Sequence, residues 1–310
     1  TRLSYAYDLR VFFRFLQETN PALMSKPMAD ISIQDLSSLQ PVDFEEFQEY
    51  LKAYKAPDNK LETNSRTGIA RKMSCLRSFY DYLCKRQLIR SNPVRLVDMP
   101  KIKEKAIIQL DPDEVASLLD YIENYGNQLT GVKLYHYNKQ KYRDIAIVTL
   151  LLGTGVRVSE LVGLNISDID FKNNGIRILR KGGNEMIVYF GEEVEKALKD
   201  YLEISRNAIT PLSGHEDALF LSGQRKRISV DAVEKMVKKY ASAVSAKTIT
   251  PHKLRSTYGT ALYRETGDIY LVADVLGHAD VNTTKKHYAK LSDARRRSAS
   301  KAVVLREKTN

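Results

Sequence analysis

The stretch SRTGIARKMSCLRSFYDYLCKRQLI, residues 65–89, predicts a long amphipathic helix and, with it, a helical N-terminal domain. Its main apolar residues recur at 4-3-4-3 spacing, which places them on one face of an α-helix. They are Ile69, Met73, Leu76, Tyr80 and Leu83. The other faces carry six basic residues, namely Arg66, Arg71, Lys72, Arg77, Lys85 and Arg86. Such a helix can pack on its own domain and lay a basic surface against DNA phosphates, although a solvated basic helix has the same pattern.

The segments before this helix also have helical patterns. SYAYDLRVFFRFLQET, residues 4–19, has apolar residues at helical spacing, and DISIQDLSSL, residues 30–39, predicts a short helix. PVDFEEFQEYLKAYK, residues 41–55, begins with proline and acidic residues, as helix N-termini prefer. After the long helix, residues from about 92 to 108 contain prolines and lysines without periodicity, which indicates an extended linker.

Beyond the linker the pattern changes. RDIAIVTLLLGTGV, residues 143–156, predicts a buried helix, and GIRILRKGGNEMIVYF, residues 175–190, predicts two strands around a Gly-Gly turn. Further helices are expected at 191–205, 229–245, 251–265, 268–276 and 282–290. We therefore predict a mainly α fold: an all-helical N-terminal domain, a mainly helical second domain with a small antiparallel β-sheet, and a tail. The predicted boundaries are 1–100 with a linker to about 108, then 109–295, then 296–310.

Charge points to a polyanionic partner. The 310-residue chain has a net charge of +11, and residues 60–103 carry eleven Lys/Arg against three Asp/Glu, whereas residues 1–59 carry six against nine. Such a concentrated charge favours nucleic acid as the partner, although a merely basic protein has the same net charge.

The sequence also favours an intracellular protein without a membrane span. No apolar run reaches about 18 residues, and the chain starts at Thr1 without a signal-peptide pattern, so we expect a cytoplasmic location. The missing initiator methionine indicates a fragment. Cys75 and Cys84 are interpreted as reduced thiols, and five scattered histidines without a CxxC pair argue against a metal site.

Several polar residues of the C-terminal half are candidates for chemistry. Arg157 stands among valines in TGVRVSEL, and a lysine stands beside the Gly-Gly turn. In TPHKLRSTYG, residues 250–259, a threonine cap and a proline begin a helix, so His252 and Arg255 share one face at its N-terminus. The full set is Arg157, Lys181, His252, Arg255, His278 and Tyr288. Taken singly, each has an ordinary structural explanation, such as a buried ion pair or a solvated lysine.

Together these residue types are suited to phosphoryl transfer. Two arginines offer planar paired donors for phosphate oxygens, and the dipole at a helix N-terminus adds to the anion site. A lysine can donate a proton to a departing alkoxide, histidines can exchange a proton or hold a phosphoryl oxygen, and a tyrosine can attack phosphorus. This chemistry needs neither a metal nor a nucleotide, so we expect no cofactor.

The same residues, in order, resemble the motifs of the tyrosine recombinase family of phage integrases and Xer proteins. The motifs are GTGVRVSEL, RKGGNE, HKLR, LGH and TTKKHY, and segment 60–90 also looks like the core-binding domain of that family. RKGG, EKMVKKY and TPHKLR are similar to single-recombinase Xer proteins and to integrases of Gram-positive mobile elements.

The resemblance implies a C-shaped DNA clamp and a role for each site residue. Two arginines and two histidines, Arg157, Arg255, His252 and His278, would surround the scissile phosphate. Lys181 would protonate the leaving 5′-oxygen, with Arg180 as second choice, and His252 is the better candidate for general base. Tyr288 would form the 3′-phosphotyrosine link.

Two residues beside these motifs need a separate interpretation. Ser256 stands where many relatives have histidine; it is interpreted as supporting the site from behind, so we expect activity to survive. His287 directly precedes the predicted nucleophile and points elsewhere on a helix, so it is interpreted as structural or DNA-facing.

The expected partner is a double-stranded DNA recombination site with inverted half-sites. The candidate DNA-binding residues are Arg66, Arg71, Lys72, Arg77, Lys85, Arg86, Arg180, Lys285 and Lys286. In the family a C-terminal tail docks on a neighbouring protomer, and the apolar residues 302–305 fit this role in a homotetramer, although a frayed basic tail is the alternative. Two other functions stay open: type IB topoisomerase-like DNA relaxation by a monomer, and DNA binding without catalysis.

Overall fold

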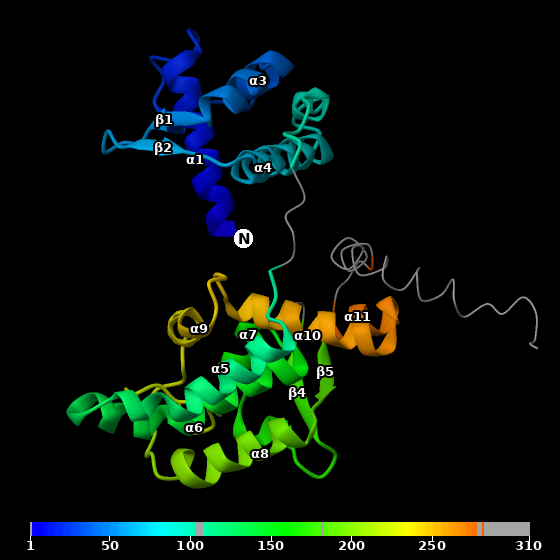
Figure 1. Cartoon of the computed structure of the whole chain (residues 1–310). Coiled ribbons are helices and arrows are strands. Elements are labelled where there is room, and N and C mark those ends of the chain that lie inside the picture. Colours follow the sequence, from blue (N-terminus) through cyan, green and yellow to red (C-terminus); the bar gives the residue numbers. More distant parts are fainter. Residues whose placement is uncertain (1, 103–107, 181–182, 278–280, 282–310) are drawn as a thin grey trace, which may run out of the picture. The chain divides into compact units, whose positions relative to one another are not determined.

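The computed structural model describes residues 2–102, 108–180, 183–277 and 281. The chain divides into two compact units, Thr1–Lys105 and Ala106–Asn310. Each unit has its own hydrophobic core, so each is described by itself (Figure 1). The prediction of a mainly helical fold with a small antiparallel sheet is confirmed.

The N-terminal unit packs its helices around an aromatic core. Its elements are α1 (Arg2–Thr19), a 3-10 turn (Met28–Asp30), α2 (Ile33–Ser38), α3 (Pro41–Tyr50), β1 (Ala53–Lys55), β2 (Leu61–Thr63), α4 (Arg66–Lys85) and a second 3-10 turn (Pro93–Leu96). The predicted apolar face of α4 is buried, and Tyr80 packs edge-on against Phe44 of α3. Phe44 stacks in turn on Phe12 of α1. Large rings bury much apolar area in a small unit, which stabilises this arrangement.

The expectation of an all-helical N-terminal domain needs one correction. Helix α3 ends at Tyr50 rather than near residue 55, and β1 and β2 form an antiparallel hairpin with Tyr54 opposite Glu62. Pro57 disfavours helical backbone at the residue before it and lacks an N–H donor, so a helix cannot continue through this segment. Asn59 closes the turn in a left-handed conformation with φ 61°, which asparagine tolerates.

The C-terminal unit is built around one long helix. Its elements up to the sheet are α5 (Pro112–Asn124), a 3-10 turn (Tyr125–Gln128), α6 (Gly131–Thr154), α7 (Val158–Gly163) and a 3-10 turn (Ile166–Asp168). The sheet contains β3 (Ile169–Asp170), β4 (Gly175–Leu179) and β5 (Glu185–Tyr189) in that order, all antiparallel. The remaining elements are α8 (Glu192–Asp200), a short π-helix (Tyr201–Arg206), α9 (Val230–Val244), α10 (Pro251–Thr266) and α11 (Ile269–Leu276).

Helix α6 organises this unit because its second half is buried on nearly all sides. It packs against α5, α8 and α10 (Figure 1). Ile147, Leu150 and Leu151 are fully buried. The helix begins twelve residues before the predicted start at 143, because the polar segment 131–142 continues the same helix. No helix in the described part of the chain is both long and apolar enough to span a membrane.

Candidate active site

The candidate site begins where α6 ends. Gly155 has φ 63°, a left-handed conformation that ends the helix, and a Cβ added there would lie 2.4 Å from the ring of Tyr258. Only glycine therefore allows the chain to turn this closely against α10. The turn places Arg157 immediately before the first residue of α7.

Arg157 is held by a carboxylate that we did not predict from sequence. Glu160 is 8% exposed, and its Oε1 accepts a hydrogen bond from Nη1 of Arg157 at 2.8 Å. Its Oε2 accepts from the Arg157 backbone N–H at 2.7 Å. A buried carboxylate is retained only when paired, so each partner fixes the other. The i, i+3 spacing within RVSE at a helix start is the sequence signal that could have identified Glu160.

Helix α10 supplies the second arginine. Thr250 stands at the N-cap and Pro251 at the first helical position, as predicted. His252 follows in the first turn and is exposed. Arg255 lies one turn further on and is 4% exposed. Its Nη1 donates to the carbonyl oxygen of Gly155, and its Nη2 donates to the carbonyl oxygen of Leu276. The hydroxyl of Ser256 donates to the His252 carbonyl oxygen at 3.1 Å, so Ser256 stabilises the helix start.

Three guanidinium groups from three parts of the unit converge on the C-terminal end of α11. Besides Arg255, Nη2 of Arg157 donates to the carbonyl oxygen of Gly277 at 3.0 Å. Nη2 of Arg180, which follows β4, donates to that of Val275 at 2.8 Å. The negative end of the helix dipole attracts cations, which accounts for this gathering.

The charge in this region is strongly positive. Three arginines meet here, Glu160 pairs with one of them, Arg157, and the N-terminus of α10 adds a positive dipole end beside His252. Burial lowers the pKa of Arg180, and the charge of Arg157 lowers it further, while Glu160 raises it. Planar, preoriented guanidinium groups with excess positive charge form an arrangement that can bind a phosphate group.

Several predicted site residues lie outside the described residues. They are Lys181, His278, Lys285, Lys286, His287 and Tyr288, and the predicted helix 282–290 and the tail lie there as well. The structure therefore brings together Arg157, Arg255 and Arg180, and places His252 on the same helix as Arg255. The six predicted catalytic roles stay predictions. Within the described part of the chain, no cluster of three or more His, Cys, Asp or Glu residues could hold a metal ion.

The basic face of α4 divides into two kinds of residue. Arg71, Lys72 and Arg77 already have partners within the unit. Arg71 forms a two-point ion pair with buried Asp8, Lys72 donates to Asn64 Oδ1 at 3.0 Å, and Arg77 donates to two backbone carbonyl oxygens in segment 94–97. Arg66, Lys85 and Arg86 are exposed, with Arg86 lying over the ring of Tyr82.

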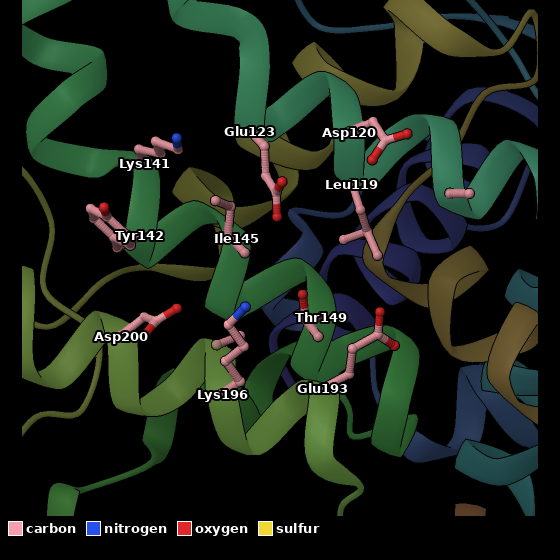
Figure 2. Close-up of a pocket in the computed structure, with 12 residues that line it drawn as sticks. Leu119, Asp120, Glu123, Lys141, Tyr142, Ile145, Thr149, Glu193, Lys196 and Asp200 are labelled. Atoms are coloured by element: carbon pink, nitrogen blue, oxygen red, sulfur yellow. The ribbon is translucent and has the colours of Figure 1, made fainter.

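A separate cavity in the C-terminal unit does not coincide with the arginines. It has a volume of about 450 Å³ and lies between α5, α6 and α8 (Figure 2). Its lining mixes apolar and charged side chains, including Leu119, Ile145, Glu193 and Lys196. Because neither Arg157 nor Arg255 lines it, we do not assign phosphate chemistry to this cavity.

Comparison with known proteins identifies related chains that match most of the length of this chain. The profile of the phage integrase family matches residues 109–295, and that of the phage integrase N-terminal SAM-like domain matches residues 1–87. Tyrosine recombinase XerC of Caldanaerobacter subterraneus is 35% identical over 309 residues, covering 96% of this chain and 79% of that protein. Tyrosine recombinase XerS of Streptococcus thermophilus is 33% identical over 305 residues, covering 92% and 85%.

Solved structures agree on the fold. The Tn1549 transposon integrase in complex with transposon right end DNA matches with a TM-score of 0.68 and 24% identity, covering 96% of this chain and 93% of that one. The XerH site-specific recombinase bound to a palindromic difH substrate matches with a TM-score of 0.66 and 20% identity, covering 87% and 74%.

Proposed function

The chain belongs to the phage integrase family of tyrosine recombinases, and from this premise we propose that it cuts and rejoins DNA through Tyr288. Its activity is that of a site-specific recombinase, an enzyme that breaks and rejoins DNA strands. The observation that supports the proposed site best is the convergence of Arg157, at the start of α7, and Arg255, on α10, at the end of α11, two residues before His278.

The proposed reaction is a balanced phosphoryl transfer. The Tyr288 oxygen attacks the scissile phosphorus and loses its proton, with His252 as the proposed base. The bond from phosphorus to the 5′-oxygen breaks, and Lys181 gives a proton to that oxygen, so a free 5′-hydroxyl leaves. Arg157 and Arg255 hold the nonbridging oxygens, whose charge grows in the transition state. Attack by a 5′-hydroxyl on the 3′-phosphotyrosine link reverses these steps and rejoins the DNA.

The proposed DNA contacts follow from which basic side chains of α4 are already bound to other residues of their own unit. Arg66, Lys85 and Arg86 remain the proposed phosphate contacts of α4, because long exposed cations can reach a polyanion. We propose that Arg71, Lys72 and Arg77 instead hold α4 in place, since each already has a partner in its own unit. Lys285 and Lys286 remain proposed contacts beside the nucleophile.

The proposed assembly is a homotetramer on a DNA site with inverted half-sites. The tail 296–310 would dock on the next protomer and support a Holliday-junction intermediate. We propose either mobile-element integration and excision or Xer-type dimer resolution as the biological role, and the relatives of this chain named tyrosine recombinase XerC and XerS support a recombinase in both cases. We also propose a cytoplasmic location, because the proposed substrate is chromosomal DNA or the DNA of a mobile element.

The nucleophile can be tested directly with Tyr288→Phe. This change removes only the attacking oxygen, so DNA binding should remain while the covalent protein–DNA complex disappears. A suicide substrate, whose cleaved strand loses a short fragment and cannot be rejoined, should trap a covalent band on a denaturing gel with the unaltered chain. Tyr270→Phe is a matched control on α11 and should still give the band. A covalent band from Tyr288→Phe would remove Tyr288 from the mechanism.

A further inference from the structure

Arg180 makes a long-range connection that neither of its predicted roles requires. It directly follows β4, yet its guanidinium reaches the last turn of α11, where Nη2 donates to the Val275 carbonyl oxygen at 2.8 Å. Nη1 lies 3.4 Å from the carbonyl oxygen of Asp274. A side chain at the end of one hairpin strand is therefore bound to the end of a helix more than 90 residues later in the chain.

The contact is closely packed. Gly277 has φ 62°, and a Cβ added there would lie 1.9 Å from Nη1 of Arg180, so the guanidinium occupies the space that any other side chain would need. Among the described residues, Nε of Arg180 is buried without a hydrogen-bond partner. Burying an unpaired donor is unfavourable, so the two contacts with α11 must hold the guanidinium in place.

The two segments that Arg180 connects each end directly before a proposed catalytic residue. Lys181 is the residue after Arg180, and His278 is the residue after Gly277. Arg157 and Arg255 donate to the carbonyl oxygens of Gly277 and Leu276, next to the two that Arg180 contacts. Arg157 and Arg255, the two arginines proposed to bind phosphate, and Arg180 thus bind one short run of backbone.

We propose that Arg180 is a positioning residue: it fixes the end of β4 against the end of α11, and through this contact it supports the proposed roles of Lys181 and His278, the next residues in sequence. The inference rests on the proposed function. It assigns Arg180 this contact with the backbone of α11, in place of the proton transfer or a DNA contact.

The first test detects the contact between Arg180 and α11 by hydrogen exchange and does not depend on enzyme activity. In Arg180→Met the stem remains but the donors and charge are lost, so amide hydrogen exchange in the peptide covering 269–277 should become faster. Arg177→Met is the matched control, because Arg177 is on β4, three residues before Arg180, and pairs with Asp168 at 2.9 Å instead. Unchanged exchange at 269–277 in Arg180→Met, or the same increase in Arg177→Met, would overturn the proposal.

The second test measures single-turnover cleavage of the suicide substrate. Misplacing catalytic groups by about 1 Å can reduce the rate on the order of 10²-fold, so we expect a loss of that size in Arg180→Met and none in Arg177→Met. If Arg180 acts through Lys181 or His278, replacing Arg180 should reduce the cleavage rate much less in a variant that already lacks that residue. The further loss should therefore shrink when Arg180→Met is added to Lys181→Ala or to His278→Ala. If the rate losses of the single variants multiply fully in both double variants, the proposal that Arg180 is a positioning residue is wrong.

A third measurement separates positioning from proton transfer. Sulfur in place of the bridging 5′-oxygen leaves without a proton, so Lys181→Ala should recover on this substrate. If Arg180→Met recovers and Lys181→Ala does not, Arg180 is itself the acid and the proposal is wrong. A wild-type chain that forms no covalent complex would instead contradict the proposed function, whatever the exchange experiment shows.

Discussion

At the scale of single residues, Arg157 depends on Glu160. The carboxylate accepts both from the guanidinium and from the backbone N–H, so it fixes the side chain and the start of α7 together. The remaining Nη2 reaches the end of α11 at Gly277. A guanidinium can make these separate contacts because its donors form a rigid planar fork, whereas an ammonium group presents one compact charge.

Arg157→Lys should therefore reduce cleavage more than binding. Each charge-assisted hydrogen bond is worth about 1.5–3 kcal/mol, so losing one phosphate contact should slow cleavage by at least about tenfold. Binding to a half-site, measured by gel shift, should change little because the charge remains. Equal losses in binding and cleavage would indicate that Arg157 is structural.

At the scale of elements, α10 is fastened to the segment that follows the linker. The backbone N–H of Leu110 donates to the Thr257 hydroxyl at 3.0 Å, and the Thr260 hydroxyl donates to the side-chain oxygen of Gln109. Before α10, Lys247 donates to Glu114 of α5 and also to the Gln109 carbonyl oxygen at 3.0 Å. The helix that carries His252 and Arg255 is thus held where the chain enters the C-terminal unit.

The Glu114–Lys247 contact predicts a pH-dependent stability. The hydrogen bond from Lys247 holds the pKa of Glu114 at about 2, below its ordinary 4.5. A lowered carboxyl pKa stabilises the fold above the unfolded-state pKa, and the effect is lost as pH falls through the folded-state pKa. Glu114→Gln should lower the melting temperature on the order of 1–3 °C at pH 7, because the pair is partly exposed, and the difference should vanish between about pH 4.5 and 2.

Thermal melting followed by circular dichroism at pH 7, 4 and 2.5 would measure this difference. Asp231→Asn removes a far more exposed ion pair, in which Asp231 and Lys235 side chains are 71% and 77% exposed, so it should change little at any pH. A Glu114→Gln effect of the same size at pH 2.5 and pH 7 would contradict the assignment to charge.

At the scale of the whole molecule, the proposed recombination needs several copies of the chain. Each unit has its own core, and the apolar residues 302–305 follow the proposed nucleophile in sequence. A tail that each protomer gives to the next is a head-to-tail contact, which can close into a ring. DNA relaxation by a monomer needs no such contact. Removing the tail therefore distinguishes recombination from relaxation.

Deleting residues 298–310 should leave binding to a half-site largely intact and abolish recombination. Complexes on a full site should shift from four protomers toward two or fewer, because the deletion removes the apolar residues that we propose are buried between protomers. Light scattering on DNA gives the protomer count, and a two-site plasmid gives recombination. Full recombination by the shortened chain would exclude the tail from the mechanism.

The sequence by itself determined the features that depend on neighbouring residues. The 4-3-4-3 spacing in 65–89 predicts α4 and its buried face, because helical periodicity is a local property. The turn around Gly183 predicts the β4–β5 hairpin, and Thr250-Pro251 predicts the start of α10. The order of the motifs identified the family, since each motif is short and contiguous.

Only the tertiary structure decided which distant groups meet. The residues around Arg71 in sequence do not show that it pairs with Asp8. Likewise, those around Arg77 do not show that it donates to carbonyl oxygens of segment 94–97. The same holds for Arg180, whose partners are more than 90 residues away at the end of α11. An exposed cation and one that holds two elements together have the same local pattern. They differ in which buried acceptors the packing of other elements brings within about 3 Å, and that distance is fixed only when the chain has folded.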